Sequence, residues 1–347
     1  MVFQRSVVTA ALPIPERGSP LLDGDLWHVL NVVEDDKPLL LAWILAAWLE
    51  DRPCPILAFT GQQGAGKSTA ARVLVQLTDP SSVPLRRPPK KEMDWPQVAM
   101  SSRVIAMDNV SAIPDGFSDS LCRAVTGDGD VQRVLYTPAD LAVYAFRRAI
   151  ILNGISWGDT RGDLGERLVT CELSPIIRRY TEEDLQAIIA EMLPGVLGAL
   201  LDLLVQVMAV LPRIQVDPLP RMADFARLLA SVDEVLGTQG LQRYRDRLER
   251  DARESADNDP VLTAIAHATV GGWRGTAAEL ARRLADMAPE GAAGRDWPRT
   301  GLKMAPYLAR TAPVARKAGW TFTDDGEDRS NKVKAWLIEP PAPLTQG

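Results

Sequence analysis

Short apolar runs, bounded by glycine, proline or charged residues, recur through the first half of the chain. Such runs, lying between turn-forming residues, are typical of strands buried on both faces of a parallel sheet. Four of them occupy residues 55–59, 103–107, 148–153 and 168–173. Alanine- and leucine-rich stretches predict helices at residues 39–49, 69–77 and 115–125. The alternation predicts an α/β core in which helices flank a parallel sheet.

The pattern becomes helical after residue 181. Thr181 and Asp184 have the spacing of a capped helix start, and helical stretches continue to about residue 254, with Pro194 among several interrupting prolines. The polar, acidic residues 252–259 predict a linker. Beyond it we expect two helices and then two strands around an acidic turn, which is the layout of a winged helix-turn-helix. These elements occupy residues 276–284, 303–316, 319–323 and 333–338.

The same pattern predicts where the parts of the chain begin and end. We expect residues 1 to about 37 to be irregular, because prolines and glycines punctuate them. The predicted parts are an N-terminal segment with one helix at 1–50, the α/β core at 51–180, an α-helical lid at 181–255 and a winged-helix domain at 260–347.

Composition excludes several classes of protein. The 347 residues carry a net charge of −6, so any nucleic-acid-binding surface must be local. The three cysteines are far apart and predict neither disulfides nor a zinc site, and both histidines, His28 and His267, are expected to be structural. We expect a cytoplasmic protein without a membrane span, because the apolar run 196–211 contains Asp202 and Gln206.

The chemistry is concentrated after the first predicted strand, in a G-x-x-x-x-G-K-S motif. Glycines let consecutive backbone N–H groups face one anion, and the helix that follows adds its positive end. In such a P-loop the lysine reaches the β- and γ-phosphates and the serine hydroxyl ligates Mg²⁺. The motif therefore predicts a site for ATP and Mg²⁺, formed by Gly61, Gln62, Gln63, Gly64, Ala65, Gly66, Lys67, Ser68 and Thr69.

Two polar residues at predicted strand ends extend this site. Asp108 follows an apolar strand in the Walker B pattern, which delivers a carboxylate to Mg²⁺. Its neighbour is Asn109, whereas many such ATPases have a glutamate that polarises the attacking water; an amide cannot accept a proton. Asn153 ends the next strand and either holds the γ-phosphate or water or simply caps the strand.

Basic segments supply further candidates. An arginine loop with Arg161 and Arg167 precedes the fourth strand, and its arginines either stabilise transition-state charge or form surface ion pairs. The proline-rich loop 85–91 faces a nucleic acid, a neighbouring subunit or only solvent. Runs at 131–136 and 141–146 predict a hairpin, although residues 138–141 also suit a helical turn. The winged helix either contacts DNA phosphates or serves protein contact; its candidate contacts are Lys303, Arg310, Arg316 and Lys317.

With these motifs in this order, the chain resembles an AAA+ ATPase, and more specifically the superfamily 3 helicase module of phage and mobile-element replication proteins. The resemblance covers residues 40–240 and implies a P-loop AAA+ core, an α-helical lid and a companion winged helix. It implies that the hairpin grips DNA, with Arg133 a candidate contact. It also implies that Asn153 is sensor 1, Arg167 the arginine finger and Arg221 a sensor 2 residue at the nucleotide.

The resemblance favours an ATP-dependent DNA helicase or translocase that acts in replication of a phage or mobile element. It implies a homo-oligomer, a hexameric ring. No primase domain precedes the module, so the resemblance also implies that either a primase partner or a longer parent polypeptide supplies priming. Asn109 keeps an alternative open, namely a slow or non-hydrolysing ATP-binding scaffold that assembles with a partner on DNA. A small-molecule or nucleotide kinase is a third class, but such an enzyme has no use for a winged helix.

Overall fold

The chain forms two compact units, each with its own buried core. The first comprises Met1–Ser156 with Glu166–Arg245, and the second Trp157–Gly165 with Asp246–Gly347. The computed structural model describes residues 6–18, 20–111, 113–133, 141–154, 162–288, 297–327 and 334–341.

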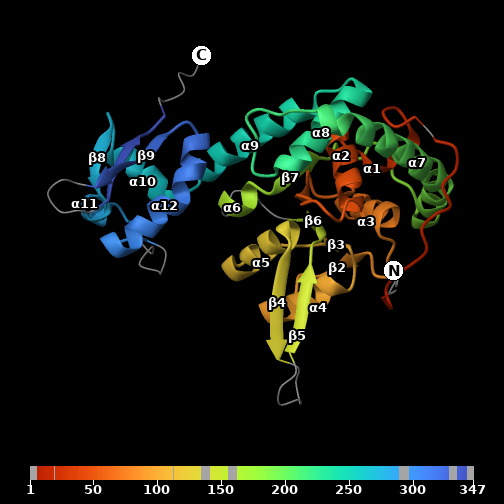
Figure 1. The fold of residues 1–347 in the computed structure, drawn as a ribbon, viewed down its shortest axis with the longest axis horizontal. Coiled ribbons are helices and arrows are strands. Elements are labelled where there is room, and N and C mark those ends of the chain that lie inside the picture. Colours follow the sequence, from red (N-terminus) through yellow and green to blue (C-terminus); the bar gives the residue numbers. More distant parts are fainter. Residues whose placement is uncertain are drawn as a thin grey trace. The chain divides into compact units, whose positions relative to one another are not determined.

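A parallel sheet forms the centre of the first unit (Figure 1). Its strand order is β2-β3-β6-β1-β7, and every neighbouring pair runs parallel. Phe59 pairs with Asn153 and Met107 with Leu152, so the carboxyl ends of β1, β3 and β6 lie level. The strands are β1 Ile56–Thr60, β2 Leu85–Arg86, β3 Val104–Met107, β6 Ala149–Asn153 and β7 Leu168–Glu172. The predicted α/β core is confirmed.

Helices cover this sheet, and α2 is the most deeply buried of those described. It is apolar on every side and packs against α3, α7, α8 and β7. A helix without a polar face must be buried all round, so α2 is part of the core of the first unit. The residues before it are less irregular than expected, because they contain the short helix α1. The bounds are α1 Asp25–Leu30, α2 Lys37–Trp48, α3 Lys67–Thr78, α4 Trp95–Met100 and α5 Asp115–Thr126.

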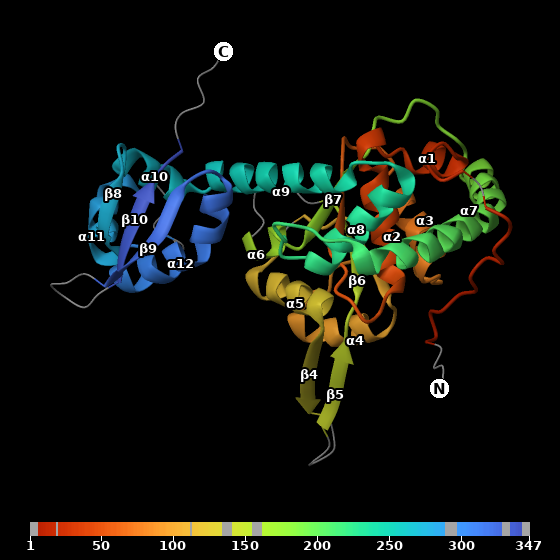
Figure 2. The same ribbon diagram turned by 45° about the horizontal axis from the view of Figure 1, so that its top comes forward.

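The predicted hairpin is confirmed as β4, Asp128–Arg133, paired antiparallel with β5, Leu141–Phe146. The first strand starts three residues earlier than predicted, because Asp128–Asp130 pair with β5 and do not form the expected turn. Residues 134–140 lie outside the described part of the chain. Both ribbon views show the hairpin extending away from the sheet, beyond α4 and α5 (Figures 1 and 2).

A helical subdomain follows β7. Thr181 Oγ1 accepts a hydrogen bond from Asp184 N (3.1 Å), which confirms the predicted cap. The expected interruption at Pro194 is wrong, because α7 continues through it. Residues 182–213 are long and apolar enough to cross a membrane, but half of their most apolar window is buried against protein, as in a core helix. The helices are α7 Glu182–Val210, α8 Ala223–Leu236 and α9 Gly240–Asp257.

Helix α9 also replaces most of the predicted linker at 252–259. Its polar residues are arranged as helical pairs, with Arg253 3.7 Å from Glu249 one turn earlier. The segment is therefore polar because it is a solvated helix, and only Asn258 and Asp259 separate it from α10.

The second unit has the predicted winged-helix layout. A strand that was not predicted, β8, joins the wing to give the antiparallel order β8-β10-β9. Helix α10 was not predicted either, and the acidic turn expected at 324–328 belongs up to Glu327 to β9. The elements are α6 Gly162–Gly165, α10 Pro260–Ala268, β8 Trp273–Thr276, α11 Ala277–Arg283, α12 Gly301–Lys317, β9 Thr321–Glu327 and β10 Lys334–Glu339.

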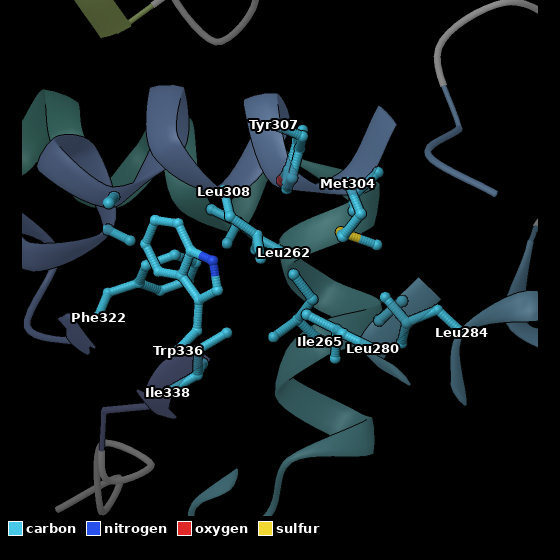
Figure 3. Packing of buried hydrophobic residues seen from close by; sticks show 14 of the residues in the cluster. Leu262, Ile265, Leu280, Leu284, Met304, Tyr307, Leu308, Phe322, Trp336 and Ile338 are labelled. Carbon is cyan, nitrogen blue, oxygen red and sulfur yellow. The ribbon is translucent and has the colours of Figure 1, made fainter. Parts of the chain in front are cut away.

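One hydrophobic cluster holds these elements together (Figure 3). Helix α12 places Tyr307 and Leu308 toward α10 and the sheet, where Phe322 and Trp336 meet edge to face at 5.8 Å. Tyr307 Oη also donates to Asp259 (2.8 Å), the residue that caps α10. With its inner face fixed in this way, α12 presents its opposite face to solvent.

Candidate functional site

The P-loop, residues 61–68, connects β1 to α3 and requires glycine at its first position. A Cβ on Gly61 would lie 2.7 Å from Leu173 O, and its φ of +130° is unfavourable for other residues. Gly66, with φ +89°, opens α3 at Lys67. The strand, loop and helix that the motif needs are all present, and the first N–H groups of α3 are available to an anion.

Two side chains of the P-loop face its interior. Lys67 Nζ donates to Gly61 O and Gln62 O, both at 2.8 Å. Ser68 Oγ donates to the Asp108 carboxylate, at 3.0 Å from Oδ2 and 3.1 Å from Oδ1. The hydroxyl and the carboxylate predicted to hold one cation are therefore adjacent, although forty residues separate them in the sequence.

Asn153 completes this group from the end of β6. Its Nδ2 donates to Lys67 O (3.2 Å) and to Asp108 Oδ1 (3.3 Å), which orients the amide. The side chain is 1% exposed, and its Oδ1 has no hydrogen-bond partner among the residues that the structure describes. A buried polar atom without a partner is costly, so it marks a place where a ligand or water can bind. This favours the site function of Asn153 over simple strand capping.

Asn109 is exposed, and its backbone is left-handed with φ +56°. Asparagine tolerates this conformation better than most residues. Its Cα would lie 3.3 Å from a Cβ on Gly154, so the chain after β3 packs closely on the end of β6. The departure from glutamate thus coincides with a backbone conformation that favours asparagine.

A pocket of about 460 Å³ adjoins the P-loop on the β7 side. We call it the α1 pocket, because Trp27, His28 and Asn31 of the α1 segment line it together with Gly66 and Tyr180. Its volume and its mixed apolar and polar lining suit a nucleoside. The sequence did not indicate the residues of the α1 segment, because that segment was expected to be irregular and His28 purely structural.

The sequence also missed a cation at the mouth of the P-loop. A Cβ on Gly64 would lie 3.8 Å from Arg179 Nη2, and Arg179 lines the α1 pocket. Arg178 stacks over the Tyr180 ring at 5.0 Å. Both arginines follow β7 in an irregular segment with no recognised motif, which explains why only the fold revealed their position.

Arg167 lies at the amino ends of the parallel strands, whereas the P-loop lies at their carboxyl ends. Ile56 N donates to Arg167 O (2.8 Å), so the arginine is level with the start of β1, whereas the P-loop follows its end. Arg167 therefore lies away from its own P-loop. Its side chain is only 7% exposed, however, and does not extend outward as a finger would. Arg161 lies outside the described residues.

Arg221 is likewise placed away from the P-loop. Its Nη1 lies 3.6 Å from Glu166 Oε2, so it joins the segment that carries Arg167. The expectation that Arg221 contacts the nucleotide of its own chain is not supported by this position.

The predicted DNA contacts are distributed over both units. On α12, Lys303, Arg310 and Arg316 are exposed, and Lys317 is half-buried. Arg310 lies over the Tyr307 ring at 5.9 Å. Lys303, Arg310 and Lys317 repeat at intervals of two helical turns and therefore share one face. Arg133 ends β4, and its side chain lies outside the described part of the structure.

The donor set fits a magnesium nucleotide. Mg²⁺ binds through one or two protein oxygens together with phosphates and waters, and Ser68 and Asp108 offer such oxygens side by side. The lysine, the helix start and the nearby arginine provide positive charge for the phosphates.

Comparison with known proteins gives two family matches. Residues 25–254 match the family described as actinomycete integrative conjugative element replication protein, and residues 260–345 match the AICE RepA C-terminal domain. No curated protein matches the chain.

Solved structures show only a distant likeness. Two apo structures of the NrS-1 C-terminal region are 14% and 12% identical, each with a TM-score of 0.43, covering 97% of this chain and 79% of theirs. Likeness at this level carries no functional argument. The family matches together span most of the chain, including both units, and the chain belongs to the replication proteins of actinomycete integrative conjugative elements.

Proposed function

We propose that this protein is an ATP-dependent motor that translocates along DNA and unwinds it during replication of the mobile element. The observation that carries the proposal is the hydrogen-bonded group of Ser68, Asp108 and Asn153 beside the P-loop. A P-loop alone needs only to bind a phosphate. A buried amide and a carboxylate at the position of the cation support hydrolysis as well.

Each residue has a distinct role in this proposal. Lys67 neutralises the β- and γ-phosphates, while Ser68 and Asp108 hold Mg²⁺. Asn153, through its unpartnered Oδ1, positions the attacking water or the γ-phosphate. The α1 pocket takes the nucleoside, and Arg179 adds a positive charge near the phosphates. When bound, Mg²⁺–ATP supplies the free energy of γ-phosphate cleavage.

The proposal includes assembly into a homo-oligomer, a hexameric ring. Arg167 lies at the amino ends of the strands, away from its own P-loop. It would therefore act on the nucleotide of a neighbouring copy, once its buried segment turns outward. The hairpin β4–β5, which extends away from the sheet, would contact DNA. The basic face of α12 would bind DNA phosphates as well.

Unwinding of a forked DNA tests this function. We expect release of the labelled strand in the presence of ATP and Mg²⁺, and no release with ADP. The Lys67→Ala variant is the matched control. Strand release that does not depend on ATP, or none under any condition that supports hydrolysis, would refute the helicase function.

Asn109 favours a second candidate, an ATP-binding scaffold with suppressed hydrolysis. In a motor, we expect Asn109→Glu to lower stability by about 1 kcal/mol, because glutamate is unfavourable in the left-handed region, and to leave turnover no faster. Asn109→Gly is the control, since glycine adopts this backbone freely. Thermal unfolding and steady-state hydrolysis measure both effects. A tenfold faster Asn109→Glu variant would favour the scaffold.

A further inference from the structure

A larger hollow, of about 830 Å³, also lies at the carboxyl ends of the parallel strands, but beside β2 and β3 and away from β7. The α1 pocket is on the β7 side, whereas this one is lined by the segments that follow β2 and β3 and by the start of α5. We call it the basic pocket. Its charged lining consists of Arg72, Arg86, Arg87, Lys90, Glu92 and Asp108.

Both carboxylates of the basic pocket already accept hydrogen bonds from neighbouring side chains. Asp108 accepts hydrogen bonds from Ser68 and Asn153, and Glu92 accepts one from Ser120 Oγ at 2.9 Å. The cations are more available: Arg87 and Lys90 are exposed. Arg72 is also exposed and reaches Glu182 only at 4.0 Å. In a chain with a net charge of −6, this is a local concentration of positive charge.

The loop that carries Arg87 and Lys90 is held in place where it leaves β2, at Arg86. Arg86 Nη1 donates to Ser101 Oγ (2.6 Å), and burial lowers the pKa of Arg86, against the opposing influence of Asp79. Pro88 and Pro89 follow, and each fixes its own φ. The loop therefore presents Arg87 and Lys90 with little conformational entropy left to lose on binding.

The rest of the lining is mixed: Asn109 and Ser111 are polar, and the other residues are apolar. Leu85, Pro88, Pro89 and Phe117 contribute to it, and Phe117 is supported edge to face by Trp95 at 5.5 Å. A hollow that combines exposed cations with apolar side chains matches a phosphodiester chain whose bases are free to leave the stack. Bases inside a duplex are stacked and cannot reach such a surface.

We propose that the basic pocket binds single-stranded DNA, with Arg72, Arg87 and Lys90 on its phosphates and the apolar lining against one base. Asp108 N donates to Arg86 O (2.9 Å), so the DNA-binding loop and the carboxylate of the candidate ATP site are joined through one backbone hydrogen bond. The link to hydrolysis rests on the proposed function: DNA bound in the basic pocket stabilises the position of Asp108 and so stimulates ATP hydrolysis.

The test uses the full chain with both loop cations reversed, Arg87→Glu with Lys90→Glu. Binding of a fluorescein-labelled oligo(dT) is followed by anisotropy at several salt concentrations. We expect affinity to fall roughly tenfold or more, and the slope of log K against log salt to fall by about 1.4, because two phosphate contacts are lost. The control is Arg213→Glu with Arg253→Glu, an equal charge change at exposed arginines outside the pocket, which should leave the slope unchanged.

Folding and assembly are measured on the same variants. Because Arg87 and Lys90 are exposed, the melting temperature should stay at the wild-type value, and Arg87→Gln with Lys90→Gln should show the same loss of binding without charge reversal. Oligo(dT) binding equal to that of the control overturns the proposal. So does a variant that loses self-assembly but binds the oligonucleotide normally, since the pocket then contacts another copy.

Binding of a fluorescent ATP analogue separates this inference from the proposed function. We expect the doubly reversed variant to bind the analogue as the wild type does, but to lose DNA-stimulated hydrolysis. If the wild type failed to bind the analogue, the proposed function would fall while the DNA site could still be confirmed by the salt slope.

Discussion

Replacing Lys67 with alanine should abolish turnover and weaken ATP binding by roughly ten- to a hundredfold. The ammonium group lies inside the P-loop, where it donates to Gly61 O and Gln62 O, so it is positioned to meet an incoming phosphate. A hydrogen bond to a charged group contributes about 1.5–3 kcal/mol, which corresponds to this loss of affinity. Titration with a fluorescent ATP analogue measures it.

The fold should survive this change, because the described hydrogen bonds of the Lys67 ammonium group all go to carbonyls of its own loop, in a solvent-accessible position. We therefore expect a melting temperature close to that of the wild type. Lys91→Ala is the matched control, since Lys91 is an exposed lysine outside the P-loop and its loss should leave ATP binding unchanged. Equal affinity of Lys67→Ala and the wild type would contradict the assignment of the P-loop.

Replacing Asp36 with alanine should give the largest loss of stability. Asp36 is fully buried, accepts a hydrogen bond from Glu172 N (2.7 Å) and pairs with Arg243 Nε at 2.9 Å. Burial alone would lower the pKa of Arg243, but the hydrogen bond and the charge of Asp36 outweigh it and raise that pKa. The aspartate therefore joins the start of α2, the end of β7 and helix α9.

Removing the Asp36 carboxylate deletes a charged hydrogen bond to Arg243, which is itself 24% exposed, and leaves Glu172 N without this acceptor, so we expect a loss of about 1.5–3 kcal/mol. Urea unfolding of Asp36→Ala should show a loss of this size. Asp35→Ala is a close control: it removes an exposed aspartate from the same turn and should change stability by about 0.5 kcal/mol or less. Similar losses in the two variants would mean that the buried pair contributes little.

The central chemistry of the candidate site could be predicted from local sequence. Asp108 and Asn153 stand at the ends of apolar strands, and Ser68 lies in the first turn of the helix that follows the P-loop after another such strand. Parallel strands present their carboxyl ends at one edge of the sheet. The fold confirms that Asp108 contacts both of the others. Their roles toward ATP and Mg²⁺ stay predictions.

Other elements were missed because their stabilisation is not local. Strand β8 has only four residues, Trp273–Thr276, and it exists through pairing with β10, some sixty residues later. Helix α1 has only six residues, too few to show a helical period in the sequence. Asp36 lies in an acidic Glu-Asp-Asp turn that suggests solvent exposure, and only the tertiary fold shows that its carboxylate is buried.

Two predictions, a helix break at a proline and a linker at a polar stretch, were wrong. Pro194 sits inside α7, where its carbonyl accepts a hydrogen bond from Glu16 N (3.0 Å), so packing of the N-terminal segment supports the helix there. The acidic stretch before Asp259 is polar because it forms the solvated end of α9. A single sequence hardly distinguishes a solvated helix from a linker when only two alanines, Ala252 and Ala256, interrupt the polar residues.

The rate of ATP hydrolysis, measured with and without single-stranded DNA, tests the central claim most directly. A DNA-driven motor predicts slow hydrolysis alone, a severalfold or greater increase when oligo(dT) is added, and loss of both rates in Lys67→Ala. A rate that single-stranded DNA does not change at any concentration, in wild-type protein that binds both ligands, would contradict it.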